Sequence, residues 1–66
     1  MMIGQLLKEH RTKNNLTQKG LAEKSGISFV AINRIERGNL PRLSVAYKLF
    51  GSMGLNLKLS IEESVS

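Results

Sequence analysis

Apolar residues recur every three or four positions along most of the chain, which predicts a series of short amphipathic helices. In the first part of the chain two helices are expected, with inward positions at Ile3, Leu6 and Leu7 and then at Leu21 and Ala22. Asn14 and Asn15 end the first of them. Thr17 is a candidate N-cap of the second, because its hydroxyl can accept a hydrogen bond from a free N–H of the first turn, and Gly26 stops that helix.

A third and a fourth helix are expected between Ser28 and Gly54. Ser28 is the candidate N-cap of the third helix, which ends at Gly38, where a glycine can adopt a left-handed conformation. Pro41 fits the first turn of the fourth helix, and Gly54 ends it. The inward positions of these two helices are Ile32 and Ile35, then Leu43, Ala46, Leu49, Phe50 and Met53.

After Gly54 the period of the pattern changes from 3.6 to two. Apolar and polar residues alternate over residues 55–61, as in a half-buried β-strand. No other segment has this pattern, so a lone strand would leave its backbone N–H and C=O groups without partners. We therefore expect the strand to pair with its copy in a second chain. The dimer interface would then contain Leu55, Leu57, Leu59 and Ile61.

Composition narrows the possible functions. The 66 residues suffice for a single domain, residues 1–66, with a small core. Ten Lys and Arg against five Glu give a net charge of +5, which favours a polyanionic partner. Charge alone leaves open DNA, RNA, an anionic membrane, or a basic surface without a partner.

Other residue types are too scarce for a catalytic or metal site. The chain has one His, no Cys and no Asp, so we expect no enzyme activity, no metal and no cofactor. No apolar run approaches the roughly 18 residues that a membrane span needs. There is also no signal-peptide pattern, and we expect a cytoplasmic protein that does not bind membranes.

Residues 17–38 have the spacing of a helix-turn-helix unit, in which the second helix lies in the major groove of DNA. The residues that carry the motif resemble those of the XRE or Cro/CI family of repressors. They are Thr17, Gln18, Leu21, Ala22, Ser25, Gly26, Ile27, Ser28, Ile32, Ile35, Glu36, Arg37 and Gly38. Residues 41–57 resemble the last helix of that family, and of HipB-type antitoxins in particular.

This resemblance implies an all-α fold, namely a four-helix lambda-repressor-like DNA-binding domain. The periodicity adds to it a C-terminal β-strand that pairs across a dimer. It implies a transcriptional repressor that binds double-stranded DNA at an inverted-repeat operator as a homodimer. The likeness to HipB-type antitoxins further implies a HipA-like kinase toxin as partner and repression of the shared operon. A phage or host repressor without a toxin is the alternative.

The resemblance also implies which residues contact DNA. Gln18 matches a family glutamine that contacts a phosphate, and a solvated glutamine is the alternative. The groove-facing positions of the family are matched by Ser28, Phe29, Val30, Asn33 and Arg34. Further candidates for phosphate contacts, equally consistent with a solvated surface, are Arg37, Asn39, Arg42 and either Lys13 or Lys19.

Phe29 and Val30 depart from the family pattern, because relatives often have Gln, Lys, Ser or Thr there. Neither side chain can hydrogen-bond to a base edge, so they would contact a thymine methyl group, or else pack inward or on a dimer partner. Asn33 suits adenine, and Arg34 suits guanine or a phosphate. At Gly20 relatives usually have the Glu that completes a capping box with the N-cap residue.

Arg11 and Glu36 match a pair of charged residues that, in the family, joins the first helix to the end of the recognition helix. A half-buried pair of this kind would fix the relative orientation of the two helices more than it would add stability. Two independent surface charges are the alternative.

Overall fold

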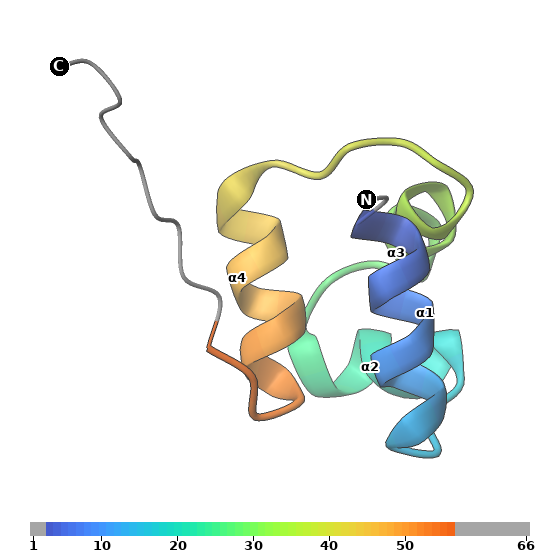
Figure 1. Ribbon diagram of the computed structural model, residues 1–66, viewed down its shortest axis with the longest axis vertical. Helices are drawn as coiled ribbons and strands as arrows, with labels where there is room; N and C mark the ends of the chain where they lie inside the picture. Colours follow the sequence, from blue (N-terminus) through green and yellow to red (C-terminus); the bar gives the residue numbers. More distant parts are fainter. Residues whose placement is uncertain (1–2, 57–66) are drawn as a thin grey trace, which may run out of the picture.

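The computed structural model describes residues 3–56, and these form four α-helices around one core (Figure 1). The helices are α1 (Ile3–Lys13), α2 (Gln18–Ser25), α3 (Phe29–Glu36) and α4 (Leu43–Ser52). Helix α1 packs against α3, and α2 packs against both α3 and α4. Within the described residues, the four-helix arrangement expected from the sequence is confirmed.

The core draws on all four helices. Its buried apolar side chains are Leu7, Leu21, Ile32, Ile35, Ala46, Leu49, Phe50 and Met53. Leu21 is fully buried in α2, the helix that packs against both α3 and α4. Truncating such a fully buried leucine to alanine typically costs about 2–5 kcal/mol. Ile32 and Ile35 of α3 are buried in the same core, so packing on its inner side sets the orientation of α3.

Local capping fixes the ends of α2 and α3. The Thr17 hydroxyl accepts a hydrogen bond from the Gly20 N–H at 2.8 Å, and the Ser28 hydroxyl accepts one from the Ala31 N–H at 3.1 Å. Gly26 ends α2 with a φ of 78°, in the left-handed region that glycine adopts readily. Both N-caps and this stop, which the sequence predicted, are confirmed.

The start of α4 differs from the sequence prediction. Pro41 precedes the helix and does not lie in its first turn, because Arg42 is still extended (ψ 152°) and acts as the N-cap residue, accepting the hydrogen bond from the Ala46 N–H. The prediction that Leu43 is buried is also wrong, since this side chain is 49% exposed. Val45, which the hydrophobic pattern did not single out, is partly buried and packs against the core.

A glycine that the sequence analysis overlooked sets the contact between α1 and α3. Gly4 is buried, and a Cβ atom on it would overlap the Ile35 carbonyl oxygen and lie 3.1 Å from the Glu36 Cα. Only glycine lets the two backbones approach so closely. Residues 4, 7 and 11 share one face of a helix, which is the signal that could have identified it.

The predicted strand, residues 55–61, lies outside the described residues except for Leu55 and Asn56. These two follow α4 and belong to no helix or strand. The Leu55 N–H donates to the Phe50 carbonyl at 3.0 Å, and its side chain packs against the core. Pairing of this segment across a dimer stays a prediction. Among residues 3–56 no helix has the length and apolar character needed to cross a bilayer.

Candidate nucleic-acid interface

Helix α3 has a buried side and an exposed side. Ile32 and Ile35 face the core, whereas Phe29 is 48% exposed and Val30 is 55% exposed. By helical spacing, the exposed side of α3 carries Phe29, Val30, Arg34 and the partly exposed Asn33, and the exposed Arg37 follows at the C-cap. We call these five residues the outer face of α3. Inward packing of Phe29 and Val30, one of the alternatives left open by the sequence, is therefore wrong for the single chain.

The turn that leads into α3 is held by hydrogen bonds of its own. The Gly26 N–H donates to the Ala22 carbonyl at 2.9 Å, and the Ile27 N–H donates to the Ser25 hydroxyl at 3.1 Å. The partly buried Ile27 side chain packs on the core at the same point. Because Ser28 is engaged as the N-cap, its hydroxyl already has a partner in the first turn of α3.

Arg11 and Glu36 form a nearly buried ion pair between α1 and the end of α3. Two guanidinium nitrogens of Arg11 donate to the two carboxylate oxygens of Glu36, at 2.7 and 3.0 Å, and a third donates to the Leu16 carbonyl at 2.8 Å. Their side chains are 11% and 5% exposed. The pair thus connects α1 and α3 to the loop that precedes α2. The alternative that Arg11 and Glu36 are two independent surface charges is therefore wrong.

The contact keeps both groups charged. The hydrogen bond to Glu36 raises the pKa of Arg11 above its ordinary value, although burial opposes this. Burial alone would raise the pKa of Glu36, but the hydrogen bonds from Arg11 and Gln18 and the positive charge of Arg11 outweigh it, so the pKa is lowered. Glu36 therefore acts as an acceptor only, with no proton of its own to donate.

Gln18, at the start of α2, links Glu36 to the outer face of α3. Its Nε2 donates to Glu36 Oε1 at 3.0 Å, and its Oε1 accepts from Asn33 Nδ2 at 3.2 Å. The side chain is therefore fixed between two helices, and a freely solvated glutamine is not what the structure shows. Sequence reasoning placed Gln18 and Asn33 at the site as separate contacts and missed the bonds between them, because these depend on the angle between α2 and α3.

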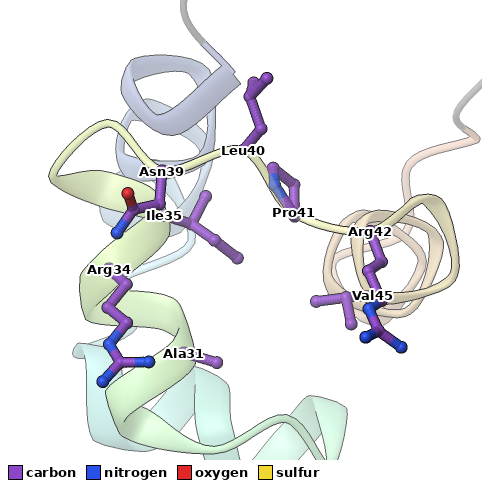
Figure 2. Close-up of a pocket in the computed structure, with 8 residues that line it drawn as sticks. All are labelled: Ala31, Arg34, Ile35, Asn39, Leu40, Pro41, Arg42 and Val45. Carbon is purple, nitrogen blue, oxygen red and sulfur yellow. The ribbon is translucent and has the colours of Figure 1, made fainter.

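Arg34, Asn39 and Arg42 border a hollow of about 560 Å³ beside the outer face of α3. Figure 2 shows Arg34 on α3 and Arg42 at the start of α4, with Asn39 on the loop between them. The Asn39 N–H donates to the Arg34 carbonyl at 3.0 Å, which holds the loop close to α3. Within residues 3–56 neither arginine forms an ion pair with an acidic side chain, so both are available to an anionic partner.

The remaining candidates are two lysines of the first two helices. Lys13 ends α1, Lys19 lies in the first turn of α2, and both are exposed. No group of three or more His, Cys, Asp or Glu side chains that could hold a metal ion occurs in the described part of the chain.

A capped helix, a tight glycine turn and a second helix with an exposed outer face together define a helix-turn-helix domain. The chain belongs to the helix-turn-helix family HTH_3, whose sequence pattern matches residues 7–60. It is similar to the uncharacterized HTH-type transcriptional regulator MJ0272 of Methanocaldococcus jannaschii, with 40% identity over 53 residues, 79% of this chain and 80% of that protein. No solved structure matches this chain.

Proposed function

We propose that this protein is a sequence-specific DNA-binding transcriptional repressor that acts as a homodimer. The observation that carries the proposal is the outer face of α3, which is held from behind by buried Ile32 and Ile35 and presents apolar, amide and guanidinium groups to solvent. Membership of the helix-turn-helix family supports DNA as the partner. The similarity to a protein named as a transcriptional regulator supports a role in transcription.

The dimensions of α3 suit the major groove of B-DNA. An α-helix with its side chains is about 10–12 Å across, and the groove is about 12 Å wide. In this placement Phe29 and Val30 contact thymine methyl groups, while Arg34 donates to guanine or to a phosphate. A-form RNA has a deep and narrow major groove that a helix does not enter, so duplex DNA fits this face better.

Phosphate contacts are assigned to groups around the outer face of α3. Gln18 Nε2 has a second N–H besides the one bonded to Glu36, and it lies at the helix start, where the backbone favours an anion. The other residues proposed to contact phosphates are Arg37, Asn39 and Arg42. Such contacts position the protein and supply most of the salt-dependent affinity.

A reporter gene placed under the region upstream of this protein's own gene tests the repressor role. We expect the wild-type protein to lower reporter expression and Arg34→Ala to restore it. Lys48→Ala is the matched control, because it also removes one exposed positive charge but lies on α4, away from the outer face of α3. Equal expression with and without the protein would contradict the proposal.

We further propose that the repressor is the antitoxin of a HipBA-like pair, with a HipA-like kinase toxin as its protein partner. The support is the likeness of residues 41–57 to HipB-type antitoxins. A phage or host repressor without a toxin is the alternative, and the neighbouring gene distinguishes the two. We expect an affinity-tagged copy, co-expressed with the adjacent open reading frame, to capture a kinase; an isolated gene and no captured kinase would favour the plain repressor.

A further inference from the structure

We propose that Glu36 and Gln18 are positioning residues for base recognition, which orient the amide of Asn33 so that it reads adenine. This inference rests on the proposed function, because it assumes that the outer face of α3 enters the major groove. It assigns a role in specificity to a buried carboxylate that itself contacts no DNA.

The chain of hydrogen bonds has a direction, and Glu36 sets it. A carboxylate only accepts hydrogen bonds, and Arg11 holds this one in place through both of its oxygens. Gln18 must therefore turn its Nε2 toward Glu36, which leaves its Oε1 on the other side. Asn33 must in turn present its Nδ2 to that oxygen.

Reversing either amide would bring like groups together. A reversed Gln18 would place its oxygen against the Glu36 carboxylate, and a reversed Asn33 would place its oxygen against Gln18 Oε1. In the described part of the chain, no buried side-chain nitrogen or oxygen lacks a hydrogen-bond partner in the observed arrangement. The observed orientation of both amides is thus the one in which each contact along this series of hydrogen bonds joins a donor to an acceptor.

This orientation leaves Asn33 with the groups that adenine requires. One N–H of Nδ2 is bonded to Gln18, so the second N–H and Oδ1 stay free. In the major groove adenine presents an acceptor, N7, beside a donor, the N6 amino group, whereas guanine presents two acceptors. A free donor and a free acceptor on one fixed amide match adenine and do not match guanine.

Selection of bound duplexes from a random library tests the inference. The wild-type protein should enrich adenine at one position of each half-site, and Asn33→Ala should lose that preference. Glu36→Gln should weaken it by about fivefold or more, since a glutamine at position 36 can also donate and no longer fixes the direction of the chain. Preferences at the other positions should persist in both variants.

Leu49→Ala is the control for a purely structural effect. It removes buried apolar volume in α4, away from the chain of hydrogen bonds, and should lower stability while keeping every base preference. All variants are compared at a temperature at which circular dichroism shows them folded. In addition, Glu36→Gln should change no preference further when Asn33 is already alanine, because the two substitutions act on one interaction.

A second measurement examines the hydrogen bonds without DNA. In the wild-type protein the side-chain NH2 signals of Gln18 and Asn33 in NMR spectra should shift together as Glu36 is protonated, and in Glu36→Gln they should not. An unchanged adenine preference in folded Glu36→Gln, or wild-type amide signals that do not shift as Glu36 is protonated, would overturn the inference. A wild-type protein that enriches no sequence would contradict the proposed function and with it the role of Glu36 in recognition, even if the amide signals respond.

Discussion

At the scale of single residues, the ion pair between Arg11 and Glu36 is the contact with the largest consequences. It is nearly buried and bidentate, and it reaches the loop before α2 as well as both helices. Removing one member of such a pair leaves the other charge buried without a counter-charge, which typically costs about 3–5 kcal/mol of stability. In a domain of this size that is a large share of the total stability.

The lowered pKa of Glu36 predicts how stability depends on pH. Because the folded-state pKa lies below the ordinary value, the carboxylate contributes stability above that ordinary value, about 4.3 for Glu, and the contribution is lost as the pH falls through the folded-state pKa. Urea unfolding of wild type and Glu36→Gln should differ by about 2 kcal/mol at pH 7, less than for loss of a whole partner, because the glutamine oxygen can still accept a hydrogen bond from Arg11. The difference should shrink in acid; a difference that is constant with pH would contradict this.

Arg34 and Arg42 are both exposed cations beside the hollow of Figure 2, but we expect different effects from their removal. Arg34→Ala should lower specific binding by about 1–3 kcal/mol and reduce discrimination, provided that Arg34 contacts a base. Arg42→Ala should weaken binding to all duplexes alike. Fluorescence anisotropy with operator and random duplexes measures both effects. If the two variants lost affinity for operator and random duplexes in the same proportion, Arg34 would contact only a phosphate.

At the scale of helices, Gly4 offers a direct test of the packing between α1 and α3. Alanine is the better helix former by up to about 1 kcal/mol, yet a Cβ at position 4 meets the backbone of Ile35. Gly4→Ala should therefore lower the free energy of unfolding by about 1–3 kcal/mol. Gly51→Ala is the matched control, since its Cβ would meet nothing within 4 Å.

We expect Gly51→Ala to be neutral or to stabilise the protein by up to about 1 kcal/mol. Urea unfolding of the two variants side by side separates helix propensity from contact between helices. If Gly4→Ala were as stable as Gly51→Ala, the close approach of α1 to α3 would be wrong.

The sequence predictions were accurate for features that depend on neighbouring residues and less accurate for features that depend on distant ones. The N-caps at Thr17 and Ser28 and the stop at Gly26 were predictable because a cap depends on residues within one turn. The start of α4 was misplaced because it depends on where the loop from α3 meets the core.

Contacts between helices were less accessible to sequence reasoning. The resemblance to a repressor family predicted the pairing of Arg11 with Glu36. Hydrophobic periodicity alone predicted only the helices in which these two residues lie. The role of Gly4 and the bonds from Gln18 to its two partners arise from interhelical distances, which no single segment encodes.

At the scale of the whole molecule, the predicted dimer links residues 55–61 to DNA binding. Leu57→Asp with Leu59→Asp puts two charges on the apolar side of the predicted strand and should give a monomer with weaker operator binding. Asn56→Asp with Ser60→Asp adds the same charge to the polar side and should stay dimeric. Sedimentation equilibrium compares them, and a dimeric Leu57 and Leu59 variant with unchanged operator affinity would contradict the role of the strand.

The central claim is that the outer face of α3 reads DNA sequence, and the most direct test is a salt series of anisotropy titrations. The duplexes are one from the region upstream of the protein's own gene, in which we expect an inverted repeat with half-sites about 34–36 Å apart, and a random duplex of equal length. Both affinities should fall steeply as salt rises, because a chain of net charge +5 displaces counterions from phosphates. The inverted repeat should bind about 1,000-fold tighter or more at physiological salt. Equal affinity for the two duplexes at every salt concentration would contradict the account.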